Sequence, residues 1–267
     1  MKRDAPIGVF DSGIGGMTVA HAIQELLPHE SILYFGDTAH LPYGDKSAES
    51  IRHYAARIAH FLLSRDCKMI VIACNTASAH AHKIVRDVCG PKIPVVDVID
   101  PVARYVASNY KSKHVGIIGT KGTISSKIYS KKIKSYQADI QVSSKATPLL
   151  ASLIEEGFYD NSISRSVIGN YLGSQSLKKI DALVLGCTHY PLIRKEVEEY
   201  YENQIEVIDS GSLVAAEVER ELKEQKGLAN GMASHTFYVS DKTASFEKST
   251  RIFFGERIRL SEARIWD

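Results

Sequence analysis

The sequence is short of the features that mark several large classes of protein. No apolar run approaches the roughly 20 residues that cross a bilayer, and the apolar stretch near the N-terminus soon meets Asp11, too early for the core of a secretion signal. Only 4 cysteines occur among 267 residues, and no CxxC pair of the zinc-binding kind is present. We therefore expect a cytoplasmic protein without a disulfide framework, a membrane anchor or a structural zinc site.

The charge balance also lacks a strong bias. The 33 Lys and Arg residues nearly match the 31 Asp and Glu residues, which gives a formal net charge of +2. Because the two signs are interspersed along the chain, no patch is expected to attract nucleic acid or a membrane surface. With 44% hydrophobic residues the chain can bury a sizeable core, and a small-molecule function is favoured.

Short apolar runs alternate with longer stretches of helical periodicity. The runs typical of strands are 7–10, 32–35 and 69–73. The helical stretches between and after them are 18–27, 47–63 and 78–88. Such alternation predicts an α/β fold with parallel sheets covered by helices.

The same plan recurs in the second half of the chain. Matching features lie about 110 residues apart, and the pairs are Gly8 with Gly116, Ile32 with Ile140, Cys74 with Cys187, and Asp97 with Asp209. We predict two pseudo-symmetric, open parallel-sheet α/β lobes, the first formed by 1–97 plus 209–267 and the second by 98–208. Ligands bind at the carboxyl ends of strands in such lobes, so we expect the active site in the cleft between them.

Cys74 and Cys187 occupy matching places in the two halves. Each follows an apolar strand and is expected to precede a helix, whose N-terminus would favour the thiolate form. The alternative is that both are simply buried apolar residues, which we expect for Cys67 and Cys89. Two opposed thiols could invert a carbon centre, because one can remove a proton while the other donates one.

An α-proton beside a carboxylate is very weakly acidic, so such a site must also stabilise developing negative charge. Backbone N–H groups near Ser12, Asn75, Thr76 and Thr188 are candidates for this task. Four motifs at these places resemble those of bacterial glutamate racemase, in the aspartate/glutamate racemase family. They are DSGIGG at 11–16, GDTAHLPYG at 36–44, ACNTAS at 73–78 and GCTHYP at 186–191, and they span nearly the whole chain.

The resemblance implies a role for particular residues. Cys74 and Cys187 would be the acid/base pair, assisted by Asp11, His189 and Glu155. The residues implied in substrate binding are Asp11, Ser12, Tyr43, Gly44, Asn75, Thr76, Thr188 and His189. The resemblance further implies that the protein interconverts L- and D-glutamate without a cofactor and supplies D-glutamate for peptidoglycan. We expect no metal site, and a homodimer is the oligomer that we consider.

Other interpretations of these residues stay open. On sequence grounds alone Asp11 suits a turn or an N-cap, Glu155 a solvated helix, and 42–44 an ordinary turn. Three positions depart from the family pattern: His40, where a basic residue is frequent, Thr147, where a cysteine is common, and Ser152, where proline is common. The competing functions are an aspartate or hydantoin racemase, and a non-catalytic module that binds an acidic metabolite.

Overall fold

The computed structural model describes residues 2–255 and 258–266. The chain divides into two compact units. The first contains the residues up to Val98 together with those from Gly211 onward, and the second runs from Ile99 to Ser210. The chain therefore leaves the first unit once, builds the whole second unit, and returns.

The first unit is built on a six-stranded sheet in which every pair of neighbouring strands is parallel. The strand order is β10-β9-β2-β1-β3-β4. The strands are β1 (Ile7–Asp11), β2 (Ile32–Gly36), β3 (Met69–Ile72), β4 (Val95–Asp97), β9 (Thr236–Val239) and β10 (Ser261–Glu262). Every residue of β1, β2 and β3 is buried, which explains why these strands appear in the sequence as continuous apolar runs.

Two groups of helices accompany this sheet. One group pairs α2 with α3, and the other packs α1 against α10 and α11. Their bounds are α1 (Met17–Leu26), α2 (Ala48–Ser64), α3 (Asn75–Cys89), α10 (Gly211–Glu224) and α11 (Ala244–Phe254), with a short 3-10 helix η1 (Tyr43–Asp45) before α2. Aliphatic and aromatic side chains of α2 and α3 share one core with those of β1, β2 and β3.

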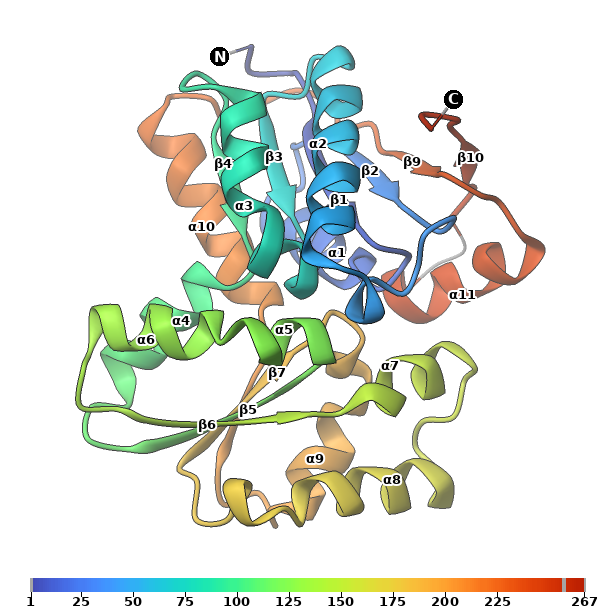
Figure 1. Ribbon diagram of the computed structural model, residues 1–267. Coiled ribbons are helices and arrows are strands. Elements are labelled where there is room, and N and C mark those ends of the chain that lie inside the picture. The colour runs from blue at the N-terminus through green and yellow to red at the C-terminus, as the bar shows by residue number, and fades with distance from the viewer. Residues whose placement is uncertain (1, 256–257, 267) are drawn as a thin grey trace. The chain divides into compact units, whose positions relative to one another are not determined.

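The second unit has a four-stranded parallel sheet of order β6-β5-β7-β8. Its strands are β5 (His114–Gly119), β6 (Gln141–Ala146), β7 (Ala182–Gly186) and β8 (Glu206–Ile208). Its helices are α4 (Asp100–Asn109), α5 (Lys121–Ser126), α6 (Ile128–Tyr136), α7 (Pro148–Glu155), α8 (Ser162–Leu172) and α9 (Arg194–Tyr200), with 3-10 helices η2 (Gln175–Leu177) and η3 (Tyr190–Ile193) (Figure 1).

The two sheets repeat one topology. The order β6-β5-β7-β8 is the order β2-β1-β3-β4 of the first unit, with each strand replaced by its sequence counterpart. The prediction of two pseudo-symmetric parallel α/β lobes is therefore confirmed. In the described part of the chain, no helix combines the length and the apolar character needed to span a bilayer.

The matched glycines Gly8 and Gly116 serve one purpose in both sheets. A methyl group on Gly8 would lie 3.0 Å from Ile70 Cδ1, and one on Gly116 would lie 3.0 Å from Leu183 Cδ1. Ile70 and Leu183 are the partners of these glycines on the neighbouring strand. Each glycine thus makes room for a side chain from the strand that delivers a cysteine.

Candidate functional site

Asp11 ends β1 in the first unit and is completely buried. Its Oδ2 accepts hydrogen bonds from the N–H groups of Gly16 at 2.9 Å and Gly13 at 3.2 Å. This is the turn-organising role that the sequence also allowed. Its other oxygen, Oδ1, is buried and has no hydrogen-bond partner among the described residues. Asp11 therefore shapes the glycine turn and still keeps one acceptor oxygen for a proton or a ligand ammonium group.

Cys74 is the N-cap residue of α3, which begins three residues earlier than the sequence predicted. Its Sγ accepts a hydrogen bond from the N–H of Ala77 at 3.4 Å and lies 3.6 Å from Ser12 Oγ. Asn75 and Thr76 form the buried first turn of the helix. The positive end of α3 thus faces the sulfur directly, an arrangement that favours the thiolate form.

Two tyrosine hydroxyl groups support the first half-site. Tyr34 donates to the carbonyl of Gly13 at 2.9 Å, and Tyr43 donates to Asp37 Oδ2 at 2.7 Å. Burial raises the pKa of Tyr34, and the charges of Asp11 and Cys74 raise it further. Burial and Asp37 likewise raise the pKa of Tyr43. Both phenols therefore stay neutral donors and are unsuited to act as bases.

Cys187 directly follows β7 in the second unit, and its side chain contacts His189, which in turn contacts Glu155. Its Sγ lies 3.6 Å from His189 Nδ1, and His189 Nε2 lies 2.8 Å from Glu155 Oε1 at the end of α7. Burial lowers the pKa of His189, but the hydrogen bonds and charges of Cys187 and Glu155 outweigh it and raise this pKa well above its ordinary value. The arrangement therefore favours an imidazolium beside the sulfur.

The prediction that a helix starts at both thiols is wrong for Cys187. The chain continues into the four-residue 3-10 helix η3, whose N-cap is His189, and the next α-helix starts only at Arg194. The carbonyl of Cys187 accepts from the N–H of Tyr190 at 3.1 Å, which closes a single tight turn. The electrostatic support of the second thiol thus comes from His189 and Glu155 rather than from a helix N-terminus.

Thr147 is one of the departures from the family pattern, and it connects the two segments that carry this triad. It is fully buried at the start of α7, and its Oγ1 lies 2.7 Å from the Tyr190 hydroxyl, which also donates to the Thr147 carbonyl at 3.1 Å. Sequence reasoning missed Tyr190 in this role. Ser152, another departure, is exposed on α7, and its carbonyl accepts from the N–H of Glu156 at 3.0 Å.

The remaining sequence-predicted positions fall in the same two half-sites. Ser12, Tyr43, Gly44, Asn75 and Thr76 belong to the first unit with Asp11 and Cys74, whereas Thr188 lies in the second unit between Cys187 and His189. Thr188 is buried, and its Oγ1 lies 3.5 Å from His189 Nδ1. Sequence reasoning also missed Asp37, although it stands inside the GDT motif.

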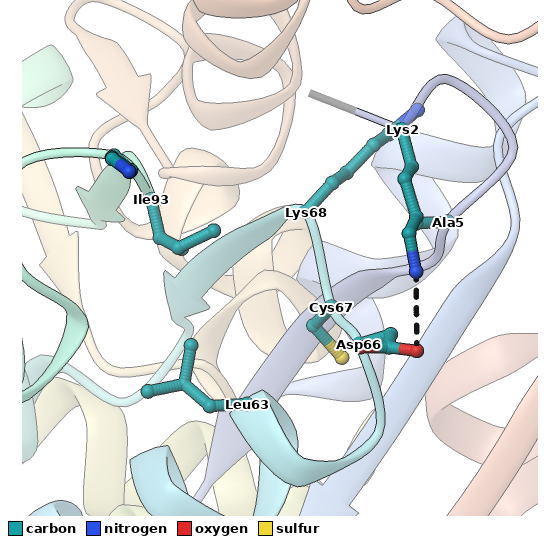
Figure 2. Close-up of a pocket in the computed structure, with 8 residues that line it drawn as sticks. Lys2, Ala5, Leu63, Asp66, Cys67, Lys68 and Ile93 are labelled. Carbon is teal, nitrogen blue, oxygen red and sulfur yellow. Dashed lines mark ion pairs between the residues drawn. The ribbon is translucent and has the colours of Figure 1, made fainter.

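A pocket of about 230 Å³ opens at the other end of β3, on the amino side of its sheet (Figure 2). Cys67 lines it, beside an ion pair in which Lys2 Nζ lies 3.5 Å from Asp66 Oδ2. Burial and the charge of Asp66 raise the pKa of Cys67 to about 12. Cys67 and Cys89 are both buried, as predicted, and this pocket lies away from the Cys74 end of the strand.

The chain is similar to known proteins over nearly its whole length. The family model of Asp/Glu/hydantoin racemase matches residues 16–218. The glutamate racemase of Chlorobaculum parvum is 44% identical over 95% of this chain and 94% of its own. The crystal structure of glutamate racemase from Francisella tularensis in complex with D-glutamate has a TM-score of 0.93 and 37% identity, covering 98% of both chains. That of a glutamate racemase isoform from Bacillus anthracis has the same TM-score and coverage at 34% identity. The chain therefore belongs to the Asp/Glu/hydantoin racemase family.

Proposed function

We propose that this protein interconverts L- and D-glutamate without a cofactor, using Cys74 and Cys187 as the two acid/base groups. The main support for the proposal is that each of the matched strands β3 and β7 is followed at its carboxyl end by a buried thiol. Each thiol has its own support for the thiolate form. A biological role in supplying D-glutamate for peptidoglycan follows if the activity is as proposed.

The reaction divides naturally between the two thiols. One thiolate removes the α-proton from one face of the amino acid, and the other thiol donates its proton to the opposite face. In the reverse direction the two thiols exchange these tasks. His189 and Glu155 would hold or release a proton next to Cys187, while the Ser12 hydroxyl and the N-terminus of α3 would stabilise the thiolate of Cys74.

Binding groups for a glutamate molecule are present in both half-sites. The free Oδ1 of Asp11 is suited to the α-ammonium group. The hydroxyl and amide groups of Ser12, Asn75, Thr76 and Thr188 are suited to carboxylates. Tyr43 and Gly44 lie in η1, which contacts α3, the helix that carries Asn75 and Thr76. Buried donors of this kind also stabilise the negative charge that develops at the α-carbon.

Glutamate is favoured over aspartate and hydantoins by the identity of the relatives. Proteins named glutamate racemase match at 40–44% identity over nearly the whole chain, and one of the solved structures holds D-glutamate. We therefore propose glutamate as the substrate and keep aspartate and hydantoins as the alternatives to be tested.

Racemisation in heavy water tests the mechanism. Purified protein should convert L-glutamate into D-glutamate that carries deuterium at Cα, while the L-glutamate still present early in the reaction keeps its protium. This asymmetry arises because the abstracted proton stays on one thiol and the product receives a deuteron from the other. Deuterium appearing equally in both enantiomers from the start would indicate a single base and would overturn the two-thiol proposal.

The same assay separates the substrates. Glutamate should turn over at least about 100-fold faster than aspartate, because a pocket built for one carboxylate position rejects a chain that cannot reach it. Hydantoins should not react. A preference for either alternative substrate would replace glutamate in the proposal without affecting the role of the thiols, and no exchange at all with any of them would favour a binding module.

A further inference from the structure

Asp37 is a buried carboxylate just beyond the end of β2, and the catalytic chemistry does not use it. Its side chain is fully inaccessible to solvent. Its Oδ2 accepts the hydroxyl proton of Tyr43 at 2.7 Å, and its Oδ1 accepts that of Ser240 at 2.7 Å. Ser240 follows β9, about 200 residues away in sequence. Asp37 thus joins the loop that carries Tyr43 to the C-terminal part of the first unit.

His40 completes the set of donors around this carboxylate. Its Nδ1 lies 3.0 Å from both oxygens of Asp37. One face of the imidazole stacks on Tyr54 of α2, with ring centroids 4.1 Å apart and planes at 18°. The edge of Trp266 meets the same ring, with centroids 4.6 Å apart and planes at 87°. His40 is therefore fixed by a hydrogen bond on one side and by two aromatic rings on the others.

The segment that delivers Trp266 is itself held in place. Strand β10 pairs in parallel with β9, and the N–H of Ala263 donates to the carbonyl of Val239 at 2.9 Å. Arg57 of α2 donates to the carbonyl of Ile265. Figure 1 shows β9 and β10 side by side at the end of the chain, next to β2. Trp266 also packs edge-on against Tyr54, with centroids 5.4 Å apart.

We propose that Trp266, His40 and Asp37 act as positioning residues that hold Tyr43 and Gly44 in the geometry needed to bind substrate. The chain of contacts runs from Trp266 to the His40 ring, from His40 Nδ1 to Asp37, and from Asp37 to the Tyr43 hydroxyl. The inference deepens the proposed function and rests on it for the identity of the substrate. Through these contacts Trp266 determines how tightly the substrate binds.

The physical reason lies in the needs of a buried carboxylate. Asp37 stays in this position only while its donors surround it, because a buried charge without partners is strongly disfavoured. Without Trp266 the His40 ring keeps only its stack on Tyr54, so it can rotate away from Asp37. Asp37 then has one donor fewer. The loop from Thr38 to Gly44 should then sample other conformations, which weakens substrate binding more than it slows proton transfer.

The test compares Trp266→Ala with Trp266→Phe, which keeps an aromatic ring. As a matched control, Tyr200→Ala removes a ring that makes a similar edge-on contact with Tyr201 in the second unit. We expect Trp266→Ala to raise KM for glutamate about 10-fold with kcat changed less than about 2-fold. Trp266→Phe should restore KM to within about 2-fold of the original protein, and Tyr200→Ala should change neither constant.

Hydrogen exchange gives a readout that does not depend on the substrate. Amides of residues 38–44 should exchange faster in Trp266→Ala than in the original protein, and at the original rate in Tyr200→Ala. Unchanged exchange in this loop would overturn the positioning role whatever the activity. If the original protein fails to racemise glutamate, the proposed function fails, and faster exchange in Trp266→Ala would still support the positioning chain.

A double variant tests whether Trp266 acts through His40. His40→Asn keeps a hydrogen-bond donor for Asp37 but removes the ring that Trp266 contacts. If the two residues act in one chain, His40→Asn combined with Trp266→Ala should raise KM no more than about 2-fold beyond the larger single effect. Effects on KM that multiply would show that Trp266 acts independently of His40 and would overturn the proposal.

Discussion

The two half-sites are copies in topology but differ in how they support a thiol. In the first unit Cys74 caps α3, so the N–H of Ala77 and the hydroxyl of Ser12 contact the sulfur. In the second unit the matching cysteine is followed by a single 3-10 turn, and His189 with Glu155 takes the place of the helix. Matching sheets deliver the two sulfurs at equivalent strand ends. A duplicated fold can therefore keep the position of a reactive group and replace its electrostatic environment.

This difference has a chemical consequence. The described contacts of Cys74 include a fixed backbone dipole and a hydroxyl group, whereas the sulfur of Cys187 lies beside a titratable pair, His189 and Glu155. The first half-site should therefore depend on backbone geometry and the second on the protonation of His189.

Loss of either thiol should have the largest effect. Cys74→Ser and Cys187→Ser should each lower kcat/KM by about 1,000-fold, because general acid or base catalysis by a placed group contributes about 100-fold to 10,000-fold. Cys89→Ser removes another buried thiol and serves as the control, with activity near that of the original protein. The racemisation rate of each of the three variants can be measured from the circular dichroism of glutamate. If either catalytic-thiol variant retains a tenth of the original activity, the two half-sites are not equally important.

Much of this framework could be predicted from sequence, because it rests on local pattern. Strands such as β1 and β3 are short apolar runs, and the matched Gly8 and Gly116 reveal the duplication. Both cysteines follow strands, so their place at the carboxyl ends of the sheets follows from parallel topology. Local pattern was enough wherever the determining contacts lie within one strand-turn-helix unit.

The supporting contacts could not be predicted because they join distant parts of the chain. Without the family resemblance Glu155 suits a solvated helix, and folding brings it to His189. The Asp37 partners Ser240 and, through His40, Trp266 lie more than 200 residues away in sequence. The helix expected after Cys187 was wrong because Pro191 and the tight turn at Tyr190 produce a 3-10 helix instead. No periodicity in the sequence encodes such pairings.

Removing the support of each thiol should separate the two half-sites. His189→Asn should lower kcat/KM by about 100-fold, the scale of one acid/base partner. Ser12→Ala should cost about 10-fold or less, since the N-terminus of α3 remains. The equilibrium between enantiomers fixes the ratio of kcat/KM in the two directions, so both directions must fall together, and unequal changes can appear only in kcat and KM separately.

The pH profiles of these variants provide the check. His189→Asn should shift the activity profile toward alkaline pH, because the thiolate at Cys187 loses the adjacent cation that stabilises it. Ser12→Ala should leave the profile in place. An alkaline shift in Ser12→Ala with none in His189→Asn would reverse the assignment of the titratable half-site.

The stability of the second unit should depend on pH through His189. Its pKa is raised well above the ordinary value in the folded state, whereas in the unfolded chain it is about 6.5. The stabilisation is therefore fully present below about pH 6.5 and is lost as pH rises through the folded-state value. Urea unfolding should show the original protein more stable than His189→Asn by about 1 kcal/mol or more at pH 6, with the gap shrinking at alkaline pH. A gap that widens with pH would contradict the protonated state of His189.

The smallest difference between the halves should appear at the matched glycines. Gly8→Ala and Gly116→Ala each place a methyl group about 3.0 Å from an isoleucine or leucine of the adjacent strand. Overpacking of this kind costs about 1–3 kcal/mol, and the two values should agree within about 1 kcal/mol because the two sheets share one topology.

Gly231→Ala is the control, since its methyl group would meet only Asp4 Oδ1 at 3.6 Å and should change stability by less than about 0.5 kcal/mol. Denaturation followed by hydrogen exchange of β1 and β5 assigns each loss to its own unit. If one glycine tolerates alanine freely while the other does not, the equivalence of the two sheets ends at the topology and does not extend to their packing.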